Sequence, residues 1–180
     1  MIGLQEPYAK RTVEGDLGLF HNLDTLAELT AADLRADDGQ EAAFQERLRS
    51  LRNVMSVPTG DEQRQDQLML TRKAVRTAVE RHAGKLERRF THNGEIWLQR
   101  GKDLTNIATL IGGGGPLAFS ADPRFVLEGA VTGNEVSLIL KPAAPSFLLD
   151  RRYILFAIGL LAGSEPAEAL RIAKKYIEKI

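Results

Sequence analysis

The sequence contains no cysteine among its 180 residues, which excludes disulfides, thiolate catalysis and thiolate metal sites. It also lacks an excess of either charge, because 24 Lys and Arg residues balance 24 Asp and Glu residues. Nucleic-acid-binding proteins usually carry a basic face, since counterion release supplies much of their affinity. No apolar run is long enough to span a membrane, and no secretory leader is visible at the start. We therefore expect a cytoplasmic protein without nucleic-acid or membrane partners.

Hydrophobic residues make up 43% of the sequence, enough for the core of one domain or of one compact half of a larger protein. The first half is patterned as helices, with apolar residues at helical spacing in segments 23–29 and 41–54. A capping-box pattern at Thr59 and Glu62 predicts the start of a long helix over 59–90. Asn93-Gly94 then predicts a turn into a strand over 95–99.

The remaining segments alternate between strand-like and helix-like patterns. Asp150 is expected to cap a nearly all-apolar helix over 151–161, and that composition predicts a buried helix. Ser164 and Pro166 are typical of the start of a second terminal helix over 167–180. The other predicted elements are a strand running into a loop at 12–18, a strand at 104–111, a helix from 116, a short helix at 124–131 and a connector at 140–145.

A cluster of four glycines, Gly112, Gly113, Gly114 and Gly115, follows the predicted strand at 104–111. Glycines at a strand end let the backbone approach a flat or anionic ligand where a Cβ atom would clash. The cluster is not a P-loop, because Pro116-Leu117 stands where that motif needs Lys-Ser/Thr. It also fails the dinucleotide fingerprint, because the sixth position is not glycine. The residues alone leave two interpretations open: a tight turn, or a wall of a ligand site.

A second candidate is the segment Glu14-Gly15-Asp16. Its two carboxylates either hold Mg²⁺ through water or belong to a solvated loop. The three histidines lack the spacing of a helical metal site, and there is no nucleophile elbow of the Gly-x-Ser-x-Gly type. We therefore expect neither catalytic residues nor a resident metal site in this chain.

Three ordered motifs give the sequence a family resemblance. The segment 11–18 (RTVEGDLG) is similar to the TVEGDLG segment of the glutamate mutase accessory MutL family, also called GlmL. Segment 110–117 (LIGGGGPL) resembles the IGTGG turn of that family, with Gly113 in place of the usual threonine. Segments 150–155 (DRRYIL) and 159–161 (GLL) resemble its C-terminal helix. This family is unrelated to the mismatch-repair protein that shares the name MutL.

The resemblance implies an actin-like ATPase fold and a chaperone-like role, in which damaged cobalamin is exchanged for intact cofactor at an adenosylcobalamin-dependent mutase. It implies ATP or ADP with Mg²⁺ as the ligand of the intact protein. By this analogy Gly112, Gly113, Gly114 and Gly115 contact the adenosine, and Glu14, Gly15 and Asp16 are weaker candidates on the phosphate side. The two phosphate motifs of the family do not occur in this sequence, so the isolated chain is not expected to hydrolyse ATP.

The expected fold is therefore α/β and helix-rich: part of the second domain of an actin-like (ribonuclease H-like) ATPase, with an inserted helical subdomain. Residues 1–20 and 94–180 would form the partial nucleotide-binding core, and 21–93 the helical subdomain. The expected partners are the mutase and the missing N-terminal half. A homodimer is also possible, because an uncovered apolar surface tends to be buried. The alternative function is a helical protein-interaction module that binds no nucleotide.

Overall fold

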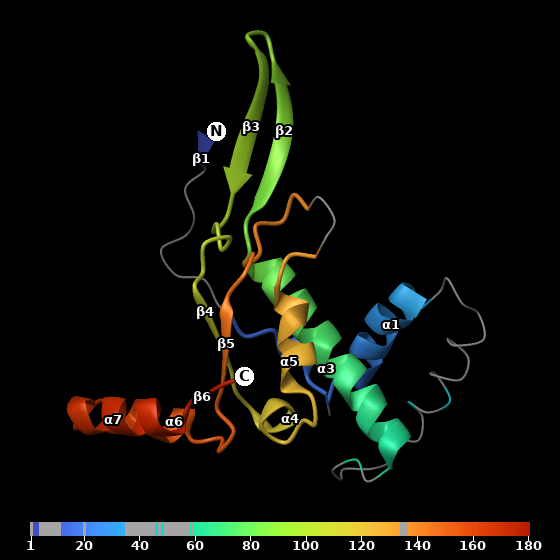
Figure 1. Cartoon of the computed structure of the whole chain (residues 1–180). Coiled ribbons are helices and arrows are strands. Elements are labelled where there is room, and N and C mark those ends of the chain that lie inside the picture. The colour runs from blue at the N-terminus through green and yellow to red at the C-terminus, as the bar shows by residue number, and fades with distance from the viewer. Residues whose placement is uncertain are drawn as a thin grey trace.

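The computed structural model describes residues 2–3, 12–19, 21–34, 46, 48, 58, 60–133 and 137–180. This part of the chain is mixed α/β, as expected, with two three-stranded sheets and a set of helices (Figure 1). The predicted helix at 41–54 and the capping residue Thr59 lie largely outside the described residues. The described elements are β1 (Ile2–Gly3), the 3-10 turn η1 (Gly15–Leu17), α1 (Leu23–Leu34), α3 (Asp61–His82), β2 (Lys85–Thr91), β3 (Gly94–Arg100), β4 (Thr109–Gly112), α4 (Gly115–Ala118), α5 (Pro123–Leu127), the 3-10 turn η2 (Glu128–Ala130), β5 (Ser146–Leu149), α6 (Leu155–Leu161), α7 (Pro166–Tyr176) and β6 (Glu178–Lys179).

Helix α3 lies between two hydrophobic cores. On one side Leu70 packs with Leu17 and with the buried residues of α1. On the other side Leu68 and Val75 pack against a core made by α4, α5 and β5. The members of this second core are Leu117, Val126, Leu127, Phe147 and Leu149. Because both cores use the same helix, α3 fixes the position of the surrounding elements.

The prediction of one helix over 59–90 is wrong in its second part. Helix α3 ends at His82, and residues 85–91 form β2, which pairs antiparallel with β3 through the predicted Asn93-Gly94 turn. The chain changes structure at Gly84, whose N–H donates to the carbonyl of Lys102 at 2.6 Å. A Cβ atom at Gly84 would lie 2.6 Å from the backbone of Gly101, so only glycine allows this close crossing. The hairpin projects from the rest of the molecule (Figure 1).

The second sheet has the order β4-β5-β6, with β4 and β5 parallel and β6 antiparallel to β5. The strand predicted at 104–111 begins only at Thr109. The strand predicted within 12–18 is absent, because this segment is extended coil and the η1 turn. Leu17 packs into the first core from that turn, which a flat strand would not allow.

The two terminal helices differ from their predictions in extent and burial. Helix α6 begins at Leu155 rather than Arg151, and Ile158 is its only buried residue. Its apolar composition was expected to mean burial, but among the described elements α6 packs chiefly on α7. Helix α7 ends at Tyr176, and the chain continues as β6 instead of remaining helical to residue 180. The division into a core of 1–20 with 94–180 and a subdomain of 21–93 stays a prediction.

None of the helices described is long and apolar enough to cross a membrane.

Candidate functional site

The glycine turn begins where β4 ends. Gly112 is buried, and its carbonyl accepts a hydrogen bond from the N–H of Asp150 at 2.9 Å. A Cβ atom at Gly112 would lie 2.9 Å from Cδ1 of Leu127 and 3.2 Å from Cδ1 of Leu117. This first glycine is therefore required by packing against the second core.

The next three glycines are less crowded: a Cβ at Gly113 would meet only Cβ of Asp150, at 3.9 Å. No heavy atom lies within 4 Å of a Cβ position built at Gly114 or Gly115. Gly114 has φ +99°, a conformation that L side chains rarely adopt, and its carbonyl accepts the first hydrogen bonds of α4. Gly113 and Gly114 thus expose backbone at a strand end, which is the geometry expected for close approach of a ligand.

Asp150 lies at the same edge of the sheet as the glycine turn. Gly112 pairs in register with Leu149 on the parallel strand β5, so Gly113 and Asp150 follow the carboxyl ends of neighbouring parallel strands. This edge is where open α/β sheets place their ligands. The Asp150 carboxylate is buried and accepts hydrogen bonds from the N–H groups of Ile154 at 3.0 Å and Leu155 at 2.7 Å. Asp150 was predicted to cap a helix from Arg151; the helix instead begins at Leu155 with Ile154 as its N-cap, and Asp150 binds the amides of Ile154 and Leu155 from the preceding turn.

A cavity of about 300 Å³ lies beside the glycine turn, between the first half of α3 and α4. Phe119, which is 80% exposed, and Pro116 contribute apolar surface from the α4 side. Helix α3 contributes polar groups, among them Gln67 and Thr71. The cavity is at the lower end of the size range of small-ligand pockets. Its complete lining is Arg64, Gln65, Gln67, Leu68, Thr71, Pro116, Phe119, Ser120 and Ala121. Sequence patterns did not identify this cavity, because its two walls are almost fifty residues apart in the chain.

The acidic segment is bound by an arginine. Nη1 of Arg81 lies 2.7 Å from Oε2 of Glu14 and 2.9 Å from Oδ1 of Asp16. The carbonyl of Gly15 accepts a hydrogen bond from Nδ2 of Asn22 at 2.6 Å. The Arg81 guanidinium lowers the pKa of Asp16, and the two carboxylates raise the pKa of Arg81. In this structure both carboxylates are therefore engaged with Arg81, and a contact of Glu14 or Asp16 with Mg²⁺ stays a prediction.

The acidic segment and the glycine turn contact different parts of α3. Leu68 lines the cavity at the glycine turn, whereas Arg81 binds Glu14 and Asp16 near the end of the helix. Thirteen residues of helix correspond to about 20 Å. The two candidates from the sequence are therefore not brought into one compact site in this structure.

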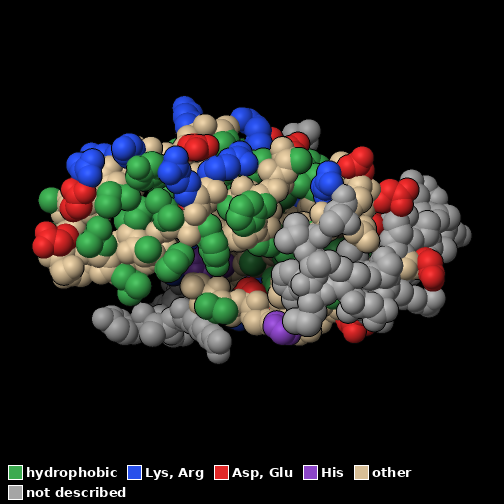
Figure 2. Space-filling view, turned by 90° about the horizontal axis from the view of Figure 1, so that it is seen from below, with side chains coloured by type: hydrophobic (Ala, Val, Ile, Leu, Met, Phe, Trp, Pro, Cys, Tyr) green, Lys and Arg blue, Asp and Glu red, His purple; other side chains and the backbone are tan. Residues whose placement is uncertain are grey.

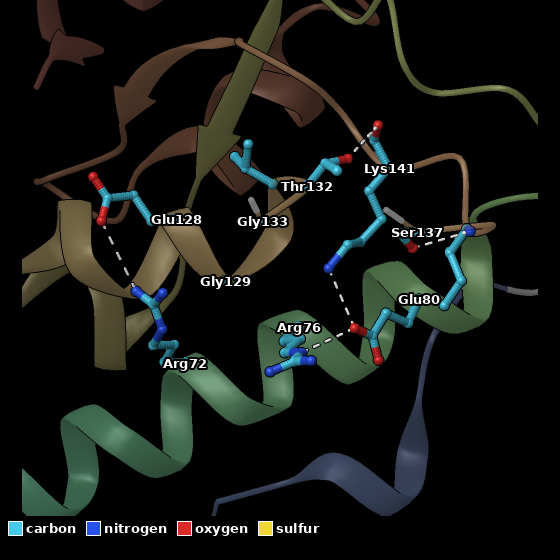
Figure 3. A pocket seen from close by; sticks show the side chains of 11 residues that line it. Arg72, Arg76, Glu80, Glu128, Gly129, Thr132, Gly133, Ser137 and Lys141 are labelled. Carbon is cyan, nitrogen blue, oxygen red and sulfur yellow. Dashed lines mark hydrogen bonds and ion pairs between the residues drawn. The ribbon is translucent and has the colours of Figure 1, made fainter. Parts of the chain in front are cut away.

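A second cavity, of about 570 Å³, lies on another side of α3 and contains an internal ion-pair network (Figure 3). Nζ of Lys141 lies 3.2 Å from Oε1 of Glu80, and Nε of Arg76 lies 2.9 Å from the same oxygen. The Lys141 side chain is 7% exposed. Burial disfavours the charged form of Glu80, but hydrogen bonds from Arg76 and Lys141 outweigh it, so its pKa is lowered. At the other end of the cavity Arg72 donates to the carbonyl of Phe125.

Within the described residues, no group of three or more His, Asp or Glu side chains is arranged to hold a metal ion.

Together the fold and the site define a mixed α/β protein with a glycine turn at the carboxyl edge of parallel strands. The chain belongs to the MutL protein family, whose model matches residues 1–177. This confirms the family resemblance drawn from the three motifs.

A curated relative, Protein MutL from Clostridium tetanomorphum, is 37% identical over 186 residues. The alignment covers 99% of this chain and 39% of that protein, so the chain spans about two fifths of the length of the relative. No solved structure matches the chain significantly.

Proposed function

We propose that this chain contributes the adenosine-binding side of a nucleotide site in a longer ATP-dependent protein of the MutL family. The observation that carries the proposal is the open backbone at Gly113 and Gly114, two to three residues before Pro116, which lines the cavity between α3 and α4. The adenine would lie against Phe119 and Pro116, because aromatic and apolar surfaces favour stacking of a flat base. The polar side chains with which α3 lines the cavity, such as Gln67, would face the edge of the base.

The geometry supports the glycines more strongly than the acidic segment. Glu14 and Asp16 are both paired with Arg81, toward the other end of α3 from the cavity. We therefore assign the adenosine contacts to Gly113–Gly115, with Gly112 packed beneath them, and no Mg²⁺ contact to Glu14, Gly15 or Asp16. Phosphate binding would come from the part of a longer family protein that this chain does not match. The isolated chain is expected to bind nucleotide weakly and not to hydrolyse it.

The wider role that we propose is that of the resembled family. The intact protein, with an actin-like fold, would use ATP to reactivate an adenosylcobalamin-dependent mutase by exchange of damaged cobalamin. The alternative, a helical interaction module, would use the helix first predicted at 59–90 as its docking surface. Helix α3 supports this alternative poorly, because its apolar side chains already pack into two cores.

The test uses Gly114→Val with Gly94→Val as its matched control. Gly94 also has positive φ (+110°) and open space, but it lies at the hairpin turn before β3 and does not line the cavity. Calorimetric titration with ADP is carried out on this chain and on a chimera, in which this chain replaces the matching segment of Protein MutL. We expect Gly114→Val to weaken ADP binding at least tenfold and Gly94→Val to leave it unchanged.

Phe119→Ala separates adenosine recognition from phosphate recognition. It should weaken binding of adenosine and ADP by about tenfold, the loss typical of a removed base stack, and should not affect inorganic phosphate. Phe90→Ala is the control, since Phe90 is 75% exposed on the hairpin. Across the wild-type chimera and these variants, the rate of ATP-dependent reactivation of glutamate mutase carrying damaged cobalamin should fall as the affinity for ADP falls. Equal ADP affinity for wild type and Gly114→Val would refute the adenosine assignment.

A further inference from the structure

The two C-terminal helices leave large apolar side chains uncovered. Phe156 is 65% exposed, Leu160 78% and Leu170 56%. Tyr153 is half exposed, and its ring lies 5.8 Å from that of Phe156. We call this surface, formed by Tyr153, Leu155, Phe156, Leu160 and Leu170, the α6–α7 face. Figure 2 shows apolar side chains gathered over these helices, with basic side chains along one border.

This exposure is unusual for the composition of α6. Every residue of Leu155–Leu161 is apolar or glycine, a pattern typical of a helix that is covered on all sides. In this structure Ile158 is the only buried residue of α6, and Ala169 the only one of α7. Monomeric proteins rarely expose contiguous apolar patches of this kind unless the patch is an interface. The sequence of α6 is therefore suited to a covering that the described residues do not supply.

The comparison with the relative shows that a family protein can be much longer than this chain. The chain aligns over 99% of its length, yet this is only 39% of Protein MutL, so a family polypeptide carries a further large segment. We propose that the α6–α7 face docks against that further segment of the longer MutL family protein. The docking is intramolecular in a longer chain and buries Phe156 and Leu160.

The segment that carries the α6–α7 face has a small basic excess. Between residues 150 and 180 there are six Lys and Arg residues and four Asp and Glu residues. Arg151 pairs with Glu178 and Arg171 with Glu168 within this segment, so a small basic excess remains. A segment with an acidic border and an apolar centre is complementary to it.

The position of the face links it to the glycine turn. Asp150 accepts hydrogen bonds from the first amides of α6 and donates its own N–H to the carbonyl of Gly112. A segment docked on α6 would consequently lie beside the turn to which we assign the adenosine. The docking itself does not require nucleotide and does not depend on the proposed function.

The test compares this chain with the chimera in which it replaces the matching segment of Protein MutL, both without nucleotide. Hydrogen exchange of the amides in α6 and α7 should be at least tenfold slower in the chimera. Exchange in the β2–β3 hairpin should be unchanged. A photo-crosslinking benzoylphenylalanine in place of Phe156 should join to the further segment of the same polypeptide.

Leu160→Lys should abolish the added protection, whereas Phe90→Lys, at a similarly exposed position, should not. Leu160 makes little contact in the isolated chain, so circular dichroism of the variant chain should remain that of wild type. Unchanged exchange in the chimera, insensitivity to Leu160→Lys, or crosslinks that join two copies would each overturn the proposal. Gly114→Val should remove ADP binding and keep the protection, so a failure of the nucleotide assignment is distinguishable from a failure of docking.

Discussion

Arg81 is the residue that sets the charge state of the acidic segment. Its guanidinium contacts both Glu14 and Asp16 and keeps the pKa of Asp16 below its ordinary value. A carboxyl group with a lowered pKa in the folded state stabilises the protein above its unfolded pKa, near 4. That contribution disappears as the pH falls through the folded pKa. The ion pair therefore helps to hold the segment 12–18 to α3 at neutral pH and weakens in acid, while Leu17 still packs into the first core.

We predict that Arg81→Gln raises the pKa of Asp16 back toward its ordinary value. Carboxyl-carbon NMR titration measures this directly. The variant should also show a weaker dependence of unfolding free energy on pH over the acidic range. Arg171→Gln is the control, because Arg171 pairs with Glu168 on α7 and should change only the pKa of that residue. An unchanged Asp16 titration in Arg81→Gln would contradict the ion-pair assignment.

Helix α6 shows how one side chain determines where an element begins. The sequence predicted a helix from Arg151, but the chain first makes a tight turn in which Tyr153 adopts φ 54°. Positive φ is costly for an aromatic residue, and here the turn is held by the Asp150 carboxylate and its two backbone donors. At the start of α7 the N-cap Glu165 makes no side-chain capping hydrogen bond, so this residue does not have the role that Asp150 has before α6.

We predict that Asp150→Ala destabilises the chain by about 1–3 kcal/mol, because it removes a buried acceptor from two amides. Glu165→Ala should cost less than about 0.5 kcal/mol, as expected for a surface substitution. Urea unfolding compares the two variants, and hydrogen exchange should locate the effect of Asp150→Ala in the first turn of α6. Equal losses of stability in both variants would mean that Asp150 does not hold the turn before α6.

The elements also indicate what the sequence could and could not predict. The glycine turn, the short helices after it and the hairpin turn were predicted, because each depends on local backbone chemistry. The β2 strand was missed because Leu86 and Phe90 are four residues apart, a spacing that places them on one face of a helix or of a strand. The cavity beside the turn and the Arg81 contacts depend on residues distant in sequence. No local pattern encodes them.

For the whole molecule, the connection between α3 and the segment near residue 141 depends on a mostly buried ion pair. Lys141 is inside the protein, and its ammonium contacts Glu80, which Arg76 also contacts. Such pairs contribute little net stability, but removal of one partner leaves a buried charge without compensation. The two partners are therefore not equivalent under mutation.

We predict that Glu80→Gln destabilises the chain by on the order of 3 kcal/mol, because Lys141 remains charged in a low-dielectric site. Lys141→Met, which removes the buried charge itself, should stay within about 1 kcal/mol of wild type. The double variant should recover most of the loss caused by Glu80→Gln. Urea unfolding of the three variants gives the comparison, and equal losses for the two single substitutions would contradict it.

One further consequence follows from the position of α3 between the two cores. A helix shared in this way cannot leave one core without exposing its apolar side chains on the other, so the two cores melt together. The two cores then behave as a single cooperative unit, although the elements that build them, from α1 to β5, are far apart in the sequence. A protease cut within α3 would remove the support of both halves at once, whereas a cut in the β2–β3 hairpin would leave this unit intact.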